Sequence, residues 1–135
     1  MISRRFVLEA LAVATLSGVG SPVSADSRRT AAIRMFDTDN DGTIDLAEAK
    51  KAASALFAKL DRDHDGTLDK RELAGRLSAR EFAAADPDHD GTLTMDEYLA
   101  VVEQRFNAAN PDKDGTLDAK ELNTSAGRAL LRLLR

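Results

Sequence analysis

The chain has 135 residues, no cysteine and a formal charge of −4; 43% of its residues are hydrophobic and only 4% are aromatic. The absence of cysteine excludes a disulfide scaffold and a thiolate metal site. The negative charge and the few aromatic side chains argue against a nucleic-acid partner, which would need basic patches or stacking platforms. The length fits one acidic domain.

The first 25 residues have the layout of an export signal. Two arginines precede the largely apolar residues 6–16, and residues 23–25 read Val-Ser-Ala, a small–x–small cleavage pattern. The apolar run is shorter than the ~20 residues of a membrane-spanning helix, and residues 3–8 resemble a twin-arginine signal, with ordinary secretion as the other route. We predict a mature domain of residues 26–135 that is periplasmic, monomeric and not membrane-bound after cleavage.

Four twelve-residue segments hold 19 of the 22 acidic residues of the mature chain. Numbered as loops 1 to 4, they are residues 37–48, 61–72, 86–97 and 110–121. Each follows the EF-hand pattern D-x-[DN]-x-[DN]-G-x₅-E, except that loop 4 begins with Asn110. Such a loop curls around a hard cation and surrounds it with about 6–8 oxygen atoms. Four copies in register are not explained by ordinary solvated acidic turns.

The candidate metal ligands occupy positions 1, 3, 5, 7, 9 and 12, with position 7 offering its backbone carbonyl and position 12 a bidentate carboxylate. They are Asp37, Asp39, Asp41, Thr43, Asp45, Glu48, Asp61, Asp63, Asp65, Thr67, Asp69, Glu72, Asp86, Asp88, Asp90, Thr92, Thr94, Glu97, Asn110, Asp112, Asp114, Thr116, Asp118 and Glu121. Position 6 is always glycine, because the sharp turn there requires a positive φ. Positions 9 and 12 also have capping-box spacing, so each loop should end by starting a helix.

The spacers between the loops have only 12, 13 and 12 residues, too few for two helices and a turn. Residues 49–60 and 98–109 carry apolar residues at helical spacing, which predicts one helix shared by two loops. The middle spacer, residues 73–85, includes Gly75, which we interpret as a local bend in a third helix. The predicted fold is all-α: a compact fused EF-hand array, a three-helix bundle with four peripheral metal-binding loops and a C-terminal helix.

The way in which the loops pair follows from the direction of these helices. If the three connecting helices run up, down and up, loops 1 and 3 share one end of the bundle, and loops 2 and 4 share the other. The apolar residues at position 8 would then meet across each end: Ile44, Leu68, Leu93 and Leu117.

The four loops and their spacers resemble the lanmodulin family of small periplasmic lanthanide-binding proteins, over nearly all of residues 31–135 and including the closing NPDKDGTLDAKEL. The resemblance implies a three-helix bundle that is poorly ordered until trivalent lanthanide ions of the La, Ce and Nd class bind. It implies strong sites in loops 1–3 and a weaker one in loop 4, where Asn110 replaces a carboxylate. It also suggests a role in lanthanide uptake, storage or trafficking.

This sequence departs from the lanmodulin pattern at two positions. Position 2 is typically proline in that family; loops 3 and 4 have it, whereas loops 1 and 2 carry Thr38 and Arg62. Position 9 typically adds a carboxylate, which Thr94 does not supply. Loops 1 and 2 therefore have five carboxylates each at ligand positions, a charge that a trivalent ion offsets better than a divalent one.

Other functions are weighed against lanthanide binding. A periplasmic Ca²⁺ buffer is the main alternative, with Ca²⁺ otherwise a weaker ligand. A Ca²⁺ sensor would expose a Met-rich groove, and the mature chain has only Met35 and Met95. An enzyme is not expected, because His64 and His89 lie at position 4 of their loops and no nucleophile–base pair is visible.

The C-terminal segment allows two interpretations. Arg128, Arg132 and Arg135 follow one side of a terminal helix whose leucines form the other side. The simpler interpretation is an exit helix packed on the core. The alternative is a docking surface for an acidic periplasmic protein partner.

Overall fold

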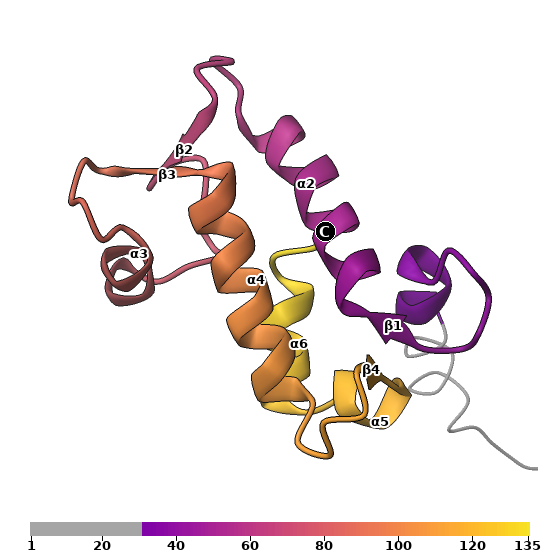
Figure 1. Ribbon diagram of the computed structural model, residues 1–135. Helices are drawn as coiled ribbons and strands as arrows, with labels where there is room; N and C mark the ends of the chain where they lie inside the picture. Colours follow the sequence, from indigo (N-terminus) through magenta and orange to yellow (C-terminus); the bar gives the residue numbers. More distant parts are fainter. Residues whose placement is uncertain (1–30) are drawn as a thin grey trace, which may run out of the picture.

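The computed structural model describes residues 31–135 (Figure 1). The predicted export signal lies outside the described residues and stays a prediction. A helical stretch over residues 31–36 comes first. The elements that follow are β1 (Ile44–Asp45), α2 (Leu46–Leu60), β2 (Thr67–Asp69), α3 (Ala79–Ala85), β3 (Thr92–Thr94), α4 (Met95–Ala109), β4 (Thr116–Leu117), α5 (Ala119–Leu122) and α6 (Ser125–Leu131). Within this part of the chain, no helix has the length and apolar character needed to cross a membrane.

Two long helices, α2 and α4, are each shared by two loops, as predicted. Helix α2 leaves loop 1 and leads into loop 2, and α4 connects loop 3 to loop 4. Both begin with a capping box made by positions 9 and 12 of the preceding loop, which satisfies the first free backbone N–H groups of the helix. The two helices pack side by side, and Phe57 meets Tyr98 edge to face with 5.7 Å between ring centroids.

The middle spacer is not one bent helix, so that part of the prediction was wrong. Turns occupy residues 70–76, and Gly75 there has a φ of +82°, which glycine adopts without steric cost. Ser78 then caps a new helix, α3, by accepting a hydrogen bond from the backbone N–H of Glu81. The chain changes direction at this break. The all-α EF-hand array is confirmed, with two short segments in place of the third long helix.

The loops pair differently from the prediction. Strand β1 of loop 1 pairs antiparallel with β4 of loop 4, and β2 of loop 2 with β3 of loop 3. The break after β2 is the reason, because it returns loop 3 to the end of the molecule where loop 2 lies (Figure 1). The position 8 residues do meet, but with other partners: Ile44 faces Leu117 and Leu68 faces Leu93, all four fully buried.

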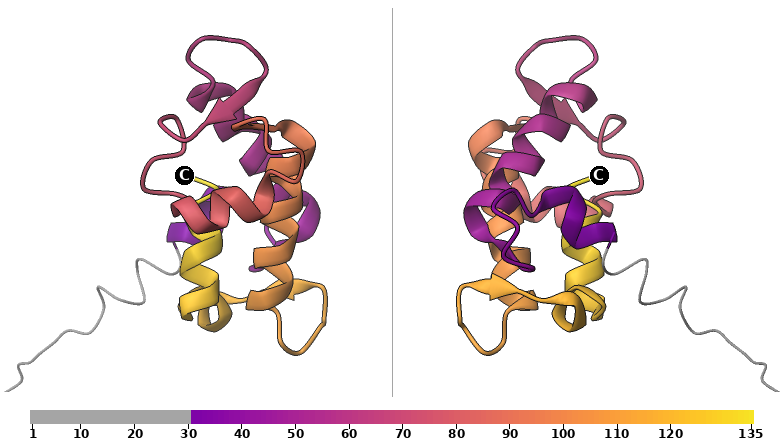
Figure 2. Two further views of the ribbon diagram at one scale, coloured as in Figure 1. Left: turned by 90° about the vertical axis from the view of Figure 1, so that its left-hand side faces the viewer. Right: turned by 90° about the vertical axis from the view of Figure 1, so that its right-hand side faces the viewer.

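Helix α6 packs along α4 and completes the core (Figure 2). The leucines of this helix and of the residues after it are buried: Leu130, Leu131, Leu133 and Leu134. The hydroxyl of Tyr98 donates a hydrogen bond to the carbonyl of Leu133 at 2.7 Å, and burial raises the pKa of this tyrosine to about 12. The simpler interpretation of the C-terminal segment, an exit helix packed on the core, is confirmed.

A buried arginine connects α4 to both α3 and α6. Arg105 is only 9% exposed, and its Nη2 forms an ion pair with Oε1 of Glu81 at 2.8 Å. Its Nη1 donates to the carbonyl of Ala129 at 2.6 Å. The pKa of Glu81 is lowered, first by the backbone N–H and hydroxyl of Ser78 and then by the charge of Arg105. Sequence analysis did not predict this connection.

Candidate metal centres

Each loop turns through two residues in the left-handed conformation. Glycine at position 6 has a φ between +83° and +87°, as predicted. The residue at position 4 also has a positive φ, between +54° and +63°. These residues are Asn40, His64, His89 and Lys113. Asparagine and histidine adopt this conformation more often than most residues, so the two histidines help the loop backbone to make its turn at position 4. Sequence analysis missed this role.

The aspartate at position 1 gathers the backbone of its loop. In loop 1, Asp37 accepts hydrogen bonds from the backbone N–H of Asp41 at 3.2 Å and of Gly42 at 2.9 Å. Asp61 in loop 2 and Asp86 in loop 3 accept from the same two positions at 2.9–3.3 Å. These bonds fold each loop back onto its first residue and fix that side chain at the centre of the turn.

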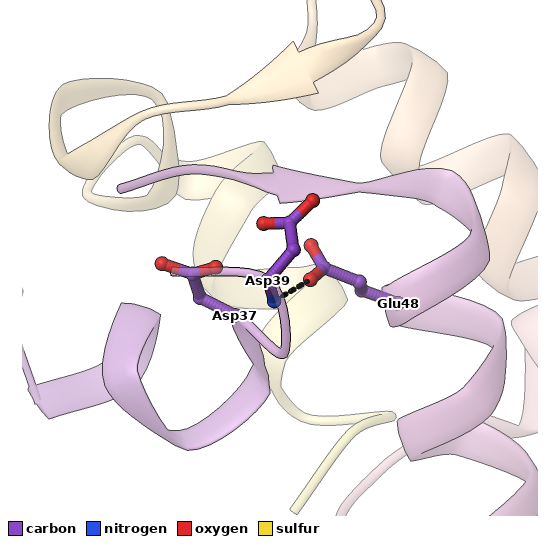
Figure 3. Close-up of side chains that lie close together, drawn as sticks. All are labelled: Asp37, Asp39 and Glu48. Atoms are coloured by element: carbon purple, nitrogen blue, oxygen red, sulfur yellow. Dashed lines mark hydrogen bonds between the residues drawn. The ribbon is translucent and has the colours of Figure 1, made fainter. Parts of the chain in front are cut away.

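Three acidic side chains converge in each of loops 1 to 3. They stand at positions 1, 3 and 12: Asp37, Asp39 and Glu48 (Figure 3), Asp61, Asp63 and Glu72, and Asp86, Asp88 and Glu97. One carboxylate oxygen from each lies within 4.8 Å of the other two. Two oxygens bound to one ion at ~2.4 Å can be at most ~4.8 Å apart, so this spacing suits a single hard cation.

The other predicted ligands are engaged within their own loop. At position 5, Asp41 accepts hydrogen bonds from both the backbone N–H and the hydroxyl of Thr43, each at 2.8 Å. At position 9, Asp45 caps helix α2 by accepting from the N–H of Glu48 at 2.8 Å. Loops 2 to 4 repeat these two arrangements. Metal ligation by positions 5, 7 and 9 stays a prediction.

Crowding moves the pKa values of neighbouring carboxyl groups apart. Desolvation, then the hydrogen bond with the aspartate at position 1, and then the charges of nearby carboxylates raise the pKa of Asp39 and of Asp63 at position 3. The hydrogen bond with Asp86 and then desolvation raise the pKa of Asp88. For Asp86 itself, desolvation acts upward, but the backbone N–H of Gly91 and other donors bring the pKa below its usual value. A bound cation would relieve this repulsion.

The glutamate at position 12 is held by a backbone donor in the first two loops. Oε1 of Glu48 accepts from the backbone N–H of Thr38 at 2.6 Å and from its hydroxyl at 3.0 Å. Oε1 of Glu72 accepts from the backbone N–H of Arg62 at 3.1 Å. Position 2 of these loops therefore supplies a donor to the residue that closes the loop.

Loop 3 lacks this donor, because Pro87 at position 2 has no N–H. Within the described protein, Oε2 of Glu97 is buried and has no hydrogen-bond partner. A buried carboxylate oxygen without a partner is unfavourable unless a cation compensates it. This orphaned oxygen shows that the donor set of loop 3 fits a metal ion.

Replacing this proline should weaken ion binding at loop 3. Pro87→Thr supplies an N–H that can satisfy Glu97 without an ion, and it also makes the ion-free loop more flexible. Both effects make the free energy of ion binding less favourable, so we expect about a 5- to 20-fold lower affinity at loop 3. La³⁺ titration followed through the amide signal of Gly91 measures it. The matched control is Pro111→Thr, which makes the same substitution in loop 4. An unchanged affinity of loop 3 in Pro87→Thr would contradict the expectation.

Loop 4 differs at position 1. Asn110 is buried, and its amide nitrogen donates to Oδ1 of Asp112 at 2.7 Å and of Asp114 at 3.2 Å, while its oxygen accepts from the N–H of Gly115 at 3.2 Å. The amide of Asn110 thus forms hydrogen bonds with the two aspartates that a carboxylate at this position would repel. Desolvation, and then the charges of neighbouring aspartates, raise the pKa of Glu121. The three-carboxylate cluster of the other loops does not recur here among the described residues.

Restoring the carboxylate should strengthen loop 4. In Asn110→Asp the amide donors are lost and loop 4 gains a fifth carboxylate at its ligand positions, as in loops 1 and 2, which increases the attraction for La³⁺. We expect about a tenfold higher affinity at loop 4, measured through the amide signal of Gly115. Asp37→Asn is the reverse substitution in loop 1 and should lower affinity there. An unchanged or lower affinity in Asn110→Asp would show that the amide of Asn110 is not the cause of the weaker ion binding expected at loop 4.

Comparison with known proteins agrees with this geometry. The profile of the family described as EF hand matches residues 30–51, 54–78 and 79–102, which is more than half of the chain and contains loops 1 to 3. The chain belongs to the EF-hand family. Lanmodulin of Methylorubrum extorquens is 70% identical over 46 residues, which are 34% of this chain and 35% of that protein. The match spans about a third of the relative's length. The chain is a lanmodulin-like EF-hand protein whose loops have the geometry of metal-binding sites.

Proposed function

We propose that this protein binds trivalent lanthanide ions in loops 1 to 3, with a weaker site in loop 4. The observation that carries the proposal is the convergence of three carboxylates in each of three loops. The local identity to a protein named lanmodulin supports the choice of metal. Packing so many carboxylates around a divalent ion leaves more repulsion than packing them around a trivalent ion of similar size.

Binding should also organise the fold. The glutamate at position 12 lies in the first turn of the helix that follows its loop, as Glu48 does in α2 and Glu97 does in α4. An ion held by this residue and by the start of the loop would tie one helix to the chain before it. Without the ion, the carboxylates that converge in each of loops 1 to 3 repel one another and oppose this closed arrangement. We therefore propose that helix content rises when the ion binds.

We place the protein in the periplasm after cleavage of residues 1–25, in lanthanide uptake, storage or trafficking. The N-terminal arginines and apolar run support export. Expression of the full chain followed by cell fractionation tests the location, with an N-terminus at Asp26 expected. Retention of the uncleaved chain in the cytoplasm would contradict it.

A Ca²⁺ buffer is the second candidate, because the EF-hand pattern itself serves Ca²⁺. A Ca²⁺ sensor is less favoured: within residues 31–135, Met35 is the exposed large hydrophobic side chain, at 61%, and one such residue does not make a target groove. The two metals are distinguished by their affinities in one sample.

The test is a parallel titration of residues 26–135 with La³⁺ and with Ca²⁺. Calorimetry measures the binding, and far-ultraviolet circular dichroism measures the helix content. We expect at least three ions per chain, a gain of helix, and a dissociation constant for La³⁺ lower by roughly 100-fold or more. Equal affinities would favour the Ca²⁺ buffer. Uptake of fewer than two ions of either kind would overturn both functions.

A further inference from the structure

The residue that directly follows the closing glutamate is different in loop 3. The residues at this place, in the order of the loops, are Ala49, Leu73, Tyr98 and Leu122, and all four are buried. Of these, tyrosine alone carries a hydroxyl, and a buried hydroxyl needs a hydrogen-bond partner. The hydroxyl of Tyr98 donates to the carbonyl of Leu133 at 2.7 Å. Loop 3 is therefore the loop whose closing residue adjoins a tether to the C-terminal segment, residues 129–135.

Three side-chain donors hold the backbone of the C-terminal segment. The acceptors are the carbonyls of Ala129, Leu133 and Arg135, which lie 2.6, 2.7 and 3.2 Å from Nη1 of Arg105, the hydroxyl of Tyr98 and Nη2 of Arg76. Carbonyls at the end of a helix have no partner within it, so such donors fix where the segment lies. Figure 2 shows the chain end, marked C, beside the turns over residues 70–76 that follow loop 2. The start of α6 is separate from this region, because Gly127 lies against the backbone of Glu121 in loop 4.

Loop 3 depends on the first turn of α4 for the position of its closing glutamate. In loops 1 and 2 the backbone N–H at position 2 holds this glutamate, but Pro87 has no N–H. Within residues 31–135, the carboxylate of Glu97 accepts hydrogen bonds from Thr94 alone, from its N–H at 3.5 Å and its hydroxyl at 3.1 Å. Thr94 caps the same helix. A shift of this turn would therefore move Glu97 away from the aspartates at the start of the loop.

We propose that Tyr98 and the C-terminal segment position Glu97 for the ion in loop 3. The inference rests on the proposed binding of lanthanide ions in that loop. The tether joins residues 35 positions apart and gives the first turn of α4 one place, so less ordering remains when the ion binds. Coupling of this kind is reciprocal, so an ion in loop 3 should in turn hold the C-terminal segment in place.

Tyr98→Phe tests the tether, because it removes the hydroxyl and keeps the ring that meets Phe57. We expect the affinity of loop 3 for La³⁺ to fall by about five- to tenfold, in the usual range for coupling between sites. Loop 2, which pairs with loop 3, should lose less, and loops 1 and 4 should stay within about twofold. The amide signals of the position 6 glycines report each loop during the titration of residues 26–135.

Val102→Ala is the matched control for a general loss of stability. Val102 is fully buried in α4, one turn after Tyr98, and its truncation leaves a cavity without removing a tether. Its effects on loops 3 and 4, at the two ends of α4, should agree within about twofold. Equal losses at all four loops in Tyr98→Phe would overturn the proposal, because the hydroxyl would then contribute only to overall stability.

The reverse effect is measured by amide hydrogen exchange at Leu133 and Leu134. Both residues are buried, and their N–H groups donate to the carbonyls of Leu130 and Leu131 at 2.8 and 3.2 Å. Glu97→Gln and Glu121→Gln are compared at saturating La³⁺. Although loop 4 is nearer in sequence, we expect Glu97→Gln to speed this exchange about fivefold more than Glu121→Gln does. The opposite order would overturn the proposal.

The number of La³⁺ ions per chain is measured for every variant, which separates this inference from the proposed function. If loop 3 of the unsubstituted protein takes up no ion, the proposed function fails at that loop and the inference fails with it. If loop 3 takes up its ion with the same affinity in Tyr98→Phe, only the inference fails.

Discussion

Glu72→Gln is expected to weaken ion binding at loop 2 by about 100-fold or more, and at loop 3 by roughly 5- to 20-fold, while loops 1 and 4 keep their affinities. Removing even an outer partner of a metal ligand typically costs ~10–100-fold, and Glu72 belongs to the carboxylate cluster itself. The effect on loop 3 follows from the pairing of β2 with β3, since coupling between sites is typically worth ~5–150-fold.

The route of this coupling is visible in the hydrogen bonds. Oε2 of Glu72 accepts from the backbone N–H of Asp69 at 3.1 Å, and Asp69 is the last residue of β2. Asp69 lies opposite Thr92 of β3, whose carbonyl is a predicted ligand of loop 3. A glutamine holds this N–H less strongly than a carboxylate does, so the strand end loosens and the neighbouring loop loses part of its shape.

The amide signals of the position 6 glycines report each loop separately during a La³⁺ titration. The matched control is Glu121→Gln, which changes the same position in the other loop pair. It should affect loop 4 most and loop 1 next, because β4 pairs with β1. If Glu72→Gln instead weakened loop 1 or loop 4 and left loop 3 unchanged, the pairing could not be the route of coupling.

The parts of the molecule that sequence predicted correctly are those in which the information is local. A metal loop needs its ligands within twelve consecutive residues, so the convergence of positions 1, 3 and 12 follows from spacing alone. The capping boxes and the shared helices α2 and α4 are equally local, because they depend on residues three or four positions apart.

The parts that sequence analysis missed depend on competition between local signals or on contacts across the chain. The sequence predicts a bend of one helix at Gly75, but Gly75 has a positive φ within the turns over residues 70–76, and the cap at Ser78 starts a separate helix, α3. That choice decided the loop pairing, because it set the direction in which loop 3 enters. The buried contact of Arg105 with Glu81 and Ala129 joins residues 24 positions apart, which no periodic pattern indicates.

The loops also differ in ways that the EF-hand pattern does not describe. The pattern treats position 2 as variable, yet its N–H determines whether the glutamate at position 12 has a donor from the chain. The pattern treats Asn110 only as the loss of a charge. Its amide also donates hydrogen bonds to Asp112 and Asp114 and so stabilises loop 4. The missing signal was the absence of an N–H in Pro87, which could have been read from the sequence.

Gly127→Ala is expected to lower the free energy of unfolding of the Ca²⁺-loaded protein by about 3 kcal/mol. A Cβ at Gly127 would overlap the carbonyl oxygen of Glu121 and lie 2.5 Å from Cα of Leu122, so the backbone of α5 and α6 has to separate. Leu122 of α5 and Leu130 of α6 are both buried and would lose packing as the helices move. Urea unfolding followed by circular dichroism measures the change.

The same displacement should reach a metal loop, because Glu121 is the closing residue of loop 4. We expect weaker ion binding at loop 4, while the affinities of loops 2 and 3, which form the other loop pair, stay unchanged. Gly75→Ala is the matched control: Gly75 has a positive φ but nothing within 4 Å of an added Cβ, so only the ~1–2 kcal/mol of left-handed strain applies. A larger loss of stability in Gly75→Ala than in Gly127→Ala would contradict the close contact of α5 with α6, because strain without steric overlap would then be the dominant cost.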